Sequence, residues 1–394
     1  MIQNNLKFLN SLRIKILEPY SDISVNFLDS FSIELKKDKN TFRSPELFSL
    51  MLFCNRKNIL KFKKKFKNDQ FRIGRGLVFH VCPKNVPINF MFSFILGLLS
   101  GNTNIIKVSS NVSKEKNVII TKIKKIFKSN KYLKLKKSNF FIEYNHQKNP
   151  EITNKISSKS DCRIVWGGDK TVKSIKKIDT QPRCLDINFA DRYSLSVINA
   201  EKFNKLSKLE IDILSRKYFY DVFTMNQMAC NSPHFIFWIG KIIKGKENYF
   251  WEKISKIASK KFKFDDVHVM KKYNNLIDKI MNIKLIKKIK MFENYLYLVD
   301  VDKNIKNIEN VRGSSGIVYQ IKLKKLDEIS QLITKKCQTI TYFGFQNKDF
   351  KNLILKNNLL GADRIVKIGQ AFEFDLVWDG FDTIKSLSRV VNIK

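Results

Sequence analysis

Apolar runs of strand length alternate with helix-like segments along most of the chain. Residues 77–82 form a continuous apolar run, residues 83–87 break it with two prolines, and residues 88–100 continue as an apolar helix. A Gly-Asn pair at 101–102 ends that helix, and residues 104–108 form the next predicted strand. A strand, a helix and a second strand in this order make a β-α-β unit.

The same alternation continues toward the C-terminus, after a first 70 residues that are predicted to be mainly helical. In that first part, Ser44, Pro45 and Glu46 suit the cap, first position and first turn of a helix. Strands that alternate with helices imply a mostly parallel sheet, with a ligand site at the carboxyl ends of its strands. The remaining predicted helices lie within 113–127 and from 169 onward, and the remaining predicted strands at 140–144, 163–166, 234–238, 295–301, 316–321 and 339–343.

The composition indicates a packed protein with a large positive charge. With 394 residues, of which 43% are apolar, the chain can form two domains or one large one. A net charge of +38 suits a nucleic-acid-binding protein, but abundant Lys, Ile, Asn and Phe are also typical of an AT-rich genome. Lysine runs at 61–67 and 134–137 suit solvated faces. The charge would also attract anionic ligands, such as phosphorylated cofactors, coenzyme A or an acidic carrier protein.

The cysteines and apolar runs bear on the compartment. The six cysteines lie far apart, with no Cys-x-x-Cys pair and no histidine at zinc spacing, which favours a reducing compartment and predicts no metal site. The N-terminus lacks the pattern of a signal peptide. The longest apolar run, 88–99, is shorter than the roughly 20 residues that cross a bilayer. We therefore expect a soluble, cytoplasmic protein without membrane insertion.

One cysteine, Cys230, follows a helix-like segment and has small or polar neighbours in Ala229, Asn231 and Ser232. A thiolate in such surroundings can attack a carbonyl or thioester carbon, a reaction that needs backbone donors and little bulk nearby. A buried structural cysteine explains the same residues, because cysteine is among the most buried residue types. Spacing alone leaves both interpretations open.

Several motifs, in order along the chain, resemble the aldehyde dehydrogenase superfamily. They begin with Cys82-Pro83-Lys84-Asn85-Val86-Pro87, a helix ending in Gly101-Asn102, and a strand that carries Lys107. Three further motifs are similar to its acyl-CoA reductase branch, to which the fatty-acid reductase of bacterial luminescence belongs. These motifs are Val165-Trp166-Gly167-Gly168-Asp169, Asn226-Gln227-Met228-Ala229-Cys230-Asn231-Ser232-Pro233, and the tail at 363–371 with Trp378-Asp379-Gly380.

The resemblance implies an α/β fold of the aldehyde dehydrogenase type, with two Rossmann-like three-layer domains and an active site in the cleft between them. We expect residues 1–220 to form a cofactor-binding domain with a helical N-terminal part. Residues 221–350 would form the catalytic domain. Residues 351–394 would return to the cofactor domain or lie at an interface, and the superfamily usually forms homo-oligomers.

The resemblance also assigns roles to particular residues. Cys230 is implied as the nucleophile, and the side-chain amide of Asn85 would stabilise the oxyanion together with the backbone N–H of Cys230. Asn85 can instead cap the turn between its two prolines. Lys107 would hold the adenosine ribose and its phosphate, although a lysine at a strand end is also often merely exposed to solvent.

Four further residues complete the predicted cofactor-binding set. Ser109 and Ser110 follow the implied cofactor lysine in its motif. Gly167 and Gly168 would allow the nicotinamide or pyrophosphate to approach the backbone closely, or else form an ordinary turn between strand and helix.

Two departures from the superfamily pattern indicate the direction of the reaction. Ser110 stands where NAD-preferring relatives carry a glutamate that binds the ribose 2′-hydroxyl, and the absence of a carboxylate makes NADPH acceptable. Asn188 falls about where oxidising members carry a general-base glutamate, and an asparagine cannot take a proton from water. Loss of hydrolysis suits a reductase, whose acyl-enzyme must survive until it is reduced.

The sequence therefore predicts an NADPH-dependent acyl-thioester reductase, an oxidoreductase that forms an aldehyde through an acyl-Cys230 intermediate. Acyl-CoA, acyl carrier protein, or a partner synthetase that passes on an acyl group would supply the substrate. One alternative is an NAD(P)-dependent aldehyde dehydrogenase that acts oxidatively. A second alternative is a basic nucleic-acid-binding protein without enzymatic activity.

Overall fold

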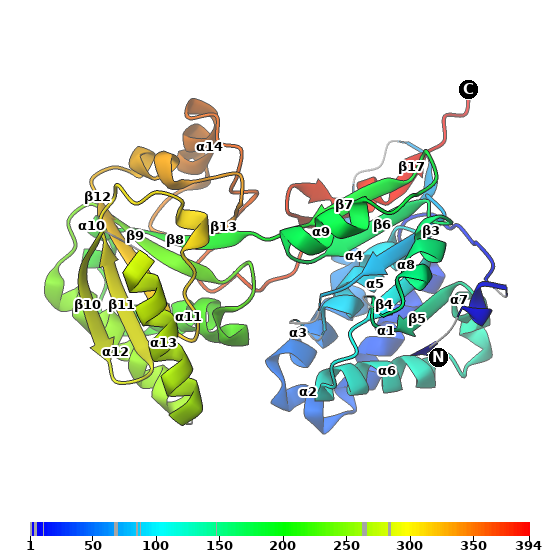
Figure 1. The fold of residues 1–394 in the computed structure, drawn as a ribbon, viewed down its shortest axis with the longest axis horizontal. Helices are drawn as coiled ribbons and strands as arrows, with labels where there is room; N and C mark the ends of the chain where they lie inside the picture. The colour runs from blue at the N-terminus through cyan, green and yellow to red at the C-terminus, as the bar shows by residue number, and fades with distance from the viewer. Residues whose placement is uncertain are drawn as a thin grey trace. The chain divides into compact units, whose positions relative to one another are not determined.

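The computed structural model describes residues 2–3, 6–10, 12–66, 70–83, 86, 88–146, 148–261, 266–282 and 285–394. Backbone contacts divide the chain into two compact units, Met1–Ala190 with Phe374–Lys394, and Asp191–Glu373. Each unit has its own mainly parallel sheet with helices packed on it (Figure 1). The chain thus has the α/β architecture that the sequence predicts.

The sheet of the first unit has the strand order β1-β5-β4-β3-β6-β7 within the described residues, and all of its strands are parallel. Two short pairs accompany it: β2 with β17, and β15 with β16, both antiparallel. The strands are β1 (Ile2–Gln3), β2 (Arg72–Gly74), β3 (Leu77–Val81), β4 (Thr103–Val108), β5 (Asn139–Glu143), β6 (Cys162–Trp166), β7 (Leu185–Phe189), β15 (Val377–Trp378), β16 (Phe381–Asp382) and β17 (Ser388–Val390).

Helices cover both faces of this first sheet, because its strands are apolar on both sides. Val78 belongs to a core cluster that includes residues of α1, α3, α5 and α6, whereas its neighbours Leu77 and Phe79 belong to a second cluster with residues of α8 and α9. The helices of the unit are α1 (Asp22–Lys36), α2 (Lys39–Arg43), α3 (Pro45–Cys54), α4 (Arg56–Lys65), α5 (Asn89–Leu99), α6 (Lys114–Ile126), α7 (Leu133–Lys136), α8 (Pro150–Ser157), α9 (Asp169–Lys176) and α15 (Thr383–Ser386), with 3-10 turns η1 (Lys7–Asn10) and η2 (Asn130–Tyr132).

The predicted elements of this unit are confirmed to within a residue or two at their ends. The apolar runs at 77–82 and 104–108 are β3 and β4, and the helix between them is α5. The predicted start of α3 is also confirmed, because the Ser44 hydroxyl accepts a hydrogen bond from the backbone N–H of Leu47 at 3.4 Å. Pro45 stands at the first helical position, and helices α1 to α4 occupy most of residues 22–65, as expected for the helical N-terminal part.

A buried polar network lies inside the first unit, around the ring of His80. The His80 ring hydrogen-bonds through Nδ1 to the Ser93 hydroxyl at 2.8 Å and through Nε2 to the Asn104 side chain at 2.9 Å. Trp166 also donates from Nε1 to the Ser93 hydroxyl, at 2.9 Å. Burial lowers the pKa of His80 to about 4, so the folded protein holds this ring neutral.

The neutral ring predicts a pH dependence that His80→Gln should remove. Unfolding restores an ordinary histidine, which takes up a proton below pH 6.5, so His80 contributes stability that is lost as pH falls from about 6.5 toward 4. Between pH 7 and 5 the free energy of unfolding of the wild type should fall by about 2 kcal/mol more than that of the variant. Urea unfolding at the two pH values measures this difference, and parallel losses in both proteins would contradict it.

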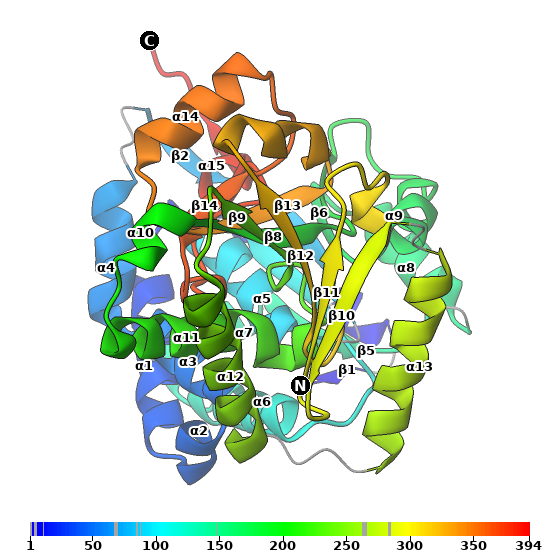
Figure 2. The same cartoon turned by 90° about the vertical axis from the view of Figure 1, so that its left-hand side faces the viewer.

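The sheet of the second unit has the order β10-β11-β12-β9-β8-β13-β14 (Figure 2). Only the β10–β11 pair is antiparallel among the pairs of this sheet in the described residues. Its strands are β8 (Tyr193–Asn199), β9 (Pro233–Ile239), β10 (Ile286–Phe292), β11 (Leu296–Val301), β12 (Ile317–Leu323), β13 (Cys337–Phe343) and β14 (Arg364–Lys367). Residues of α11 and α12 pack in one core cluster, and residues of α13 and α14 in another. The helices are α10 (Ala200–Asn204), α11 (Lys208–Phe223), α12 (Lys244–Lys261), α13 (Asp266–Asn282) and α14 (Asn347–Lys356), with 3-10 turns η3 (Thr224–Gln227), η4 (Ile308–Asn310) and η5 (Leu326–Leu332).

The two units divide at other places than the sequence suggests. Strand β8 pairs with β9 and β13, so the second unit begins at Asp191, whereas the first predicted domain runs to 220. Strand β14 pairs with β13, so the chain stays in the second unit beyond 351. Of the predicted C-terminal segment, 351–394, only the part from Phe374 onward belongs to the first unit, where β17 pairs with β2. Long-range strand pairing sets both boundaries, and it leaves no local signal in the sequence.

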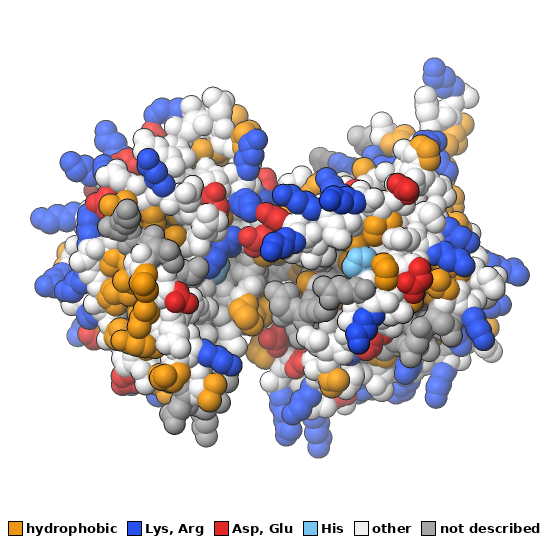
Figure 3. Space-filling view, in the orientation of Figure 1, with side chains coloured by type: hydrophobic (Ala, Val, Ile, Leu, Met, Phe, Trp, Pro, Cys, Tyr) orange, Lys and Arg blue, Asp and Glu red, His pale blue; other side chains and the backbone are white. Residues whose placement is uncertain are grey.

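Basic side chains are spread over the surface. On the face drawn in Figure 3, lysines and arginines of both units are interspersed with acidic and apolar residues. No helix of the described residues is long and apolar enough to cross a membrane.

Candidate active site and the family of the chain

Cys230 follows a strained turn at the end of α11. Three consecutive residues, Met225, Asn226 and Gln227, have positive φ angles of 53°, 52° and 64°. A residue other than glycine in the left-handed region costs about 1–2 kcal/mol, and such residues persist where the surroundings fix them. Strain of this kind clusters at functional sites.

The side chain of Gln227 fixes the turn. Its Nε2 donates to the carbonyl oxygens of Pro233 and Ile317, both at 3.0 Å, and its Oε1 accepts from the backbone N–H of Gly316 at 3.1 Å. Gln227 is only 1% exposed, so its amide group is satisfied by these protein hydrogen bonds and not by water. Pro233 and Ile317 are the first residues of β9 and β12, so one amide group ties the turn to the start of two neighbouring strands.

The backbone around Cys230 is held on both sides. The carbonyl oxygen of Cys230 accepts a hydrogen bond from the Ser194 hydroxyl at 2.6 Å. The N–H of Ser232 donates to the carbonyl of Ala229 at 2.9 Å, and the Asn231 side chain donates to the carbonyl of Ala371 at 2.6 Å. Cys230 itself is partly buried and partly accessible. The segment therefore presents its thiol from a fixed backbone.

The other cysteines have different surroundings. Cys184 is the one other cysteine that is not buried, and burial, followed by the charge of Asp186, raises the pKa of its thiol. Burial likewise raises the thiol pKa of the four buried cysteines, to about 12 in Cys82 and Cys337. The buried cysteines are Cys54, Cys82, Cys162 and Cys337. Only Cys230 combines accessibility with a strained, hydrogen-bonded turn.

The C-terminal motif of the second unit lies beside the cysteine segment. The buried carboxylate of Asp221 accepts backbone hydrogen bonds from Gly369 at 2.6 Å and Ala371 at 3.0 Å. The Arg364 guanidinium donates to the carbonyl of Ala371 at 2.7 Å, the same oxygen that Asn231 contacts. Burial raises the pKa of Asp221 to about 7, although the two N–H groups and Arg364 favour its charged form. Asp221 and Arg364 thus hold the motif against the residue next to Cys230.

Lys107 and Ser109 stand at the carboxyl end of β4 in the first unit. Lys107 is 7% exposed, and its ammonium nitrogen lies 5.3 Å from the centre of the Tyr144 ring. The Ser109 hydroxyl accepts from the backbone N–H of Asn111 at 3.1 Å, and Ser110 is exposed. Lys107 is therefore held in place and is not a freely solvated strand-end lysine.

Gly167 and Gly168 stand at the carboxyl end of β6, in the same sheet. A Cβ atom at Gly167 would approach Thr171 to 3.1 Å, whereas a Cβ atom at Gly168 would meet no atom of the described residues within 4 Å. Gly168 has a φ of −66°, which any residue adopts. Among the described residues, neither a close contact nor the backbone conformation requires a glycine at position 168. A glycine there would leave the backbone accessible to a ligand.

The structure also places two asparagines that the sequence singled out. Asn188 lies on β7, and its buried Oδ1 has no hydrogen-bond partner among the described residues. Asn85 lies outside the described residues.

Sequence reasoning gave no role to Gln227, although it lies in the cysteine motif, or to Lys116, which contacts Ser109. Each also contacts a residue far along the chain, Gln227 the carbonyl of Ile317 and Lys116 the carboxylate of Glu143, and only the fold reveals these contacts. The described part of the chain contains no group of three or more His, Cys, Asp or Glu residues that could hold a metal ion.

Comparison with known proteins supports the resemblance seen in the motifs. A long-chain acyl-protein thioester reductase of Aliivibrio fischeri is 22% identical over 330 residues, covering 81% of this chain and 64% of the relative. A protein of the same name from Photorhabdus laumondii is 22% identical over 326 residues, covering 80% of this chain and 63% of the relative. The chain thus spans somewhat less than two thirds of the length of these curated relatives.

Solved structures establish the fold. Proline utilization A of Bradyrhizobium japonicum matches with a TM-score of 0.64 at 12% identity, over 95% of this chain and 41% of that one. Staphylococcus aureus AldH matches with a TM-score of 0.59 at 13% identity, over 94% of this chain and 88% of that one. The fold is therefore that of the aldehyde dehydrogenases, as the motifs led us to expect. The family model described as acyl-CoA reductase (LuxC) matches residues 50–390, and the chain belongs to that family.

Proposed function

We propose that this protein reduces an acyl thioester to an aldehyde, with NADPH as reductant and with the acyl group held on Cys230. The main support for the proposal is the strained turn before Cys230, whose backbone is fixed by the hydrogen bonds of the Gln227 side chain. Family membership and the name of the curated relatives, long-chain acyl-protein thioester reductase, support the reaction class.

In the first half-reaction, the Cys230 sulfur attacks the thioester carbon, and a carbon–sulfur bond forms as the donor thiol leaves with a proton. Ala229, Asn231 and Ser232 leave little bulk beside the sulfur. Two neutral donors, the backbone N–H of Cys230 and the side-chain amide of Asn85, would stabilise the developing negative oxygen. Such donors lower the barrier without taking part in proton transfer.

The second half-reaction needs a reductant, and the carboxyl ends of β4 and β6 fit a nicotinamide dinucleotide. The backbone at Gly168 is accessible to a ligand, and Lys107 supplies a positive charge at a fixed position. Position 110 is a serine and not a glutamate, so no carboxylate at this position would repel a 2′-phosphate. When bound, the reduced nicotinamide would supply a hydride to the acyl carbon. The carbon–sulfur bond to Cys230 would then break, which releases the aldehyde, and the sulfur would take up a proton from solvent. Ser109 and Gly167 would contact the same cofactor.

Asn188 protects the acyl group in this proposal. An amide side chain cannot remove a proton from water, so the thioester on Cys230 is not hydrolysed to a carboxylic acid. The acyl donor is a thiol ester of coenzyme A or of a protein, and the positive charge of the chain suits either donor.

Mass spectrometry of the intact protein tests the proposal. After mixing with a long-chain acyl-CoA and no NADPH, we expect an adduct of one acyl group on Cys230, which disappears with release of aldehyde when NADPH is added. Cys184→Ala should give the same adduct, because Cys184 is the matched accessible cysteine. An adduct that maps to another residue, or release of a carboxylic acid in place of aldehyde, would contradict the proposal.

A further inference from the structure

A buried lysine joins the end of β4 to the end of β5. The Lys116 ammonium, on α6, donates to the carbonyl oxygen of Ser109 at 2.9 Å and lies 3.4 Å from Oε2 of Glu143. Lys116 is only 6% exposed. The backbone of Lys116 is also held in place, because its N–H donates a hydrogen bond to the hydroxyl of Ser113, the N-cap of α6, at 3.0 Å.

Glu143 is the acidic group that this lysine neutralises. Glu143 is the last residue of β5 and lies in register with Val108 of β4, so its carboxylate stands beside the segment that holds Lys107 and Ser109. The side chain is 28% exposed and therefore reaches solvent at this edge of the sheet. A carboxylate here would repel a phosphate group bound to the same edge, and partial burial leaves that repulsion poorly screened.

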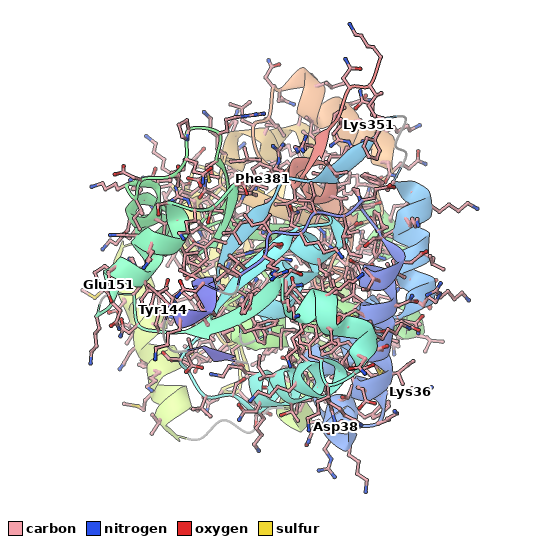
Figure 4. All side chains as sticks on the ribbon, turned by 90° about the vertical axis from the view of Figure 1, so that its right-hand side faces the viewer. Lys36, Asp38, Tyr144, Glu151, Lys351 and Phe381 are labelled. Atoms are coloured by element: carbon pink, nitrogen blue, oxygen red, sulfur yellow. The ribbon has the colours of Figure 1, made fainter. Side chains whose placement is uncertain are left out.

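The other charged groups at this edge do not replace Lys116. Lys107 lies against the Tyr144 ring, and the Tyr144 hydroxyl hydrogen-bonds to Thr153 at 2.7 Å. Burial raises the pKa of Tyr144, and the charge of Glu151 adds to this effect; both residues are labelled in Figure 4. Glu151 is exposed, so solvent screens its charge. Among the described residues at this edge, Lys116 and Glu143 thus form an ion pair in which the lysine is buried and the carboxylate is partly exposed.

We infer that Lys116 determines the preference for NADPH over NADH by neutralising Glu143 at the edge where the 2′-phosphate binds. This inference rests on the proposed function. With Lys116 present, the pair has no net charge and Lys107 is left to attract the phosphate. Without Lys116, the carboxylate of Glu143 repels a 2′-phosphate, but it can still accept a hydrogen bond from the 2′-hydroxyl of NADH.

The test compares dissociation constants for NADPH and NADH, measured by calorimetry without acyl substrate. Lys116→Met keeps the aliphatic stem and removes the charge, so we expect NADPH to bind about 10-fold more weakly while NADH changes less than about 3-fold. The double variant Lys116→Met with Glu143→Gln should regain most of the NADPH affinity, because the repelling carboxylate is gone. Lys116→Arg should keep the wild-type preference.

Lys122→Met is the matched control. Lys122 lies on the same helix and pairs with Asp38 at 2.8 Å, away from the strand ends, so its loss should leave the cofactor preference unchanged. If the wild type prefers NADPH and Lys116→Met keeps this preference, the inference about Lys116 is wrong, but the proposed cofactor is not affected. Equal weakening of both cofactors in Lys116→Met also overturns the inference. Wild-type protein that binds neither dinucleotide overturns the proposed cofactor, and this inference with it.

Discussion

Cys230→Ala is expected to reduce the rate of aldehyde formation by roughly 10⁴-fold or more, because removal of a nucleophile leaves only binding and electrostatic contributions to catalysis. The substitution removes one sulfur atom from a partly accessible position, so we expect little change in stability. Steady-state assays with acyl-CoA and NADPH measure the rate, and thermal unfolding checks the fold.

Cys184→Ala is the control for Cys230→Ala. It removes the other thiol that is not buried and should retain nearly full activity. Activity that survives Cys230→Ala, or that is lost equally in both variants, would show that the reaction does not depend on this thiol. Cys230→Ser would add a second check, because a hydroxyl is a far weaker nucleophile than a thiolate at neutral pH.

Gln227→Met is expected to have the second largest effect. The variant keeps a similar volume but loses the three hydrogen bonds that the Gln227 side chain makes to backbone groups of Pro233, Gly316 and Ile317. We expect a loss of about 3 kcal/mol in the free energy of unfolding. Acylation of Cys230 should slow by about 10²-fold, because a nucleophile displaced by about 1 Å loses roughly that factor.

Gln320→Met separates positioning of the thiol from loss of stability. Gln320 is also buried in this sheet and makes three side-chain hydrogen bonds, with Trp238, Glu247 and Asp300. Its replacement should lower stability without changing the pH profile of Cys230 alkylation by iodoacetamide, whereas Gln227→Met should change that profile. If the two variants alter the alkylation profile equally, Gln227 has no special effect on the thiol.

The sequence did not predict the parallel strands β1, β7, β8 and β14, but it did predict others that are buried on both faces. Such strands are continuous apolar runs, and β3, β4, β9 and β13 stand out for that reason. Strand β10 was missed because it is an exposed edge strand in which Lys287, Lys288 and Lys290 interrupt the apolar pattern.

The candidate site could be predicted from the sequence only as far as its local motifs. The cysteine and glycine motifs are contiguous, so their order along the chain was enough to suggest chemistry. The left-handed turn was not predictable, because a glutamine stabilises it by binding residues as far along the chain as Ile317. The Lys116–Glu143 pair was also beyond sequence reasoning, because it forms only when α6 packs beside the ends of β4 and β5.

The path of the chain through the two units affects how the protein folds during its synthesis. The first unit lacks β17 until the ribosome has translated the whole second unit, because residues 374–394 supply that strand and Leu387, whose carbonyl accepts a hydrogen bond from the buried Asn102 side chain. The second unit is one continuous stretch and can fold as soon as it emerges. We therefore expect the unit that contains Cys230 to mature first, although the ribosome completes the other unit's N-terminal part before it.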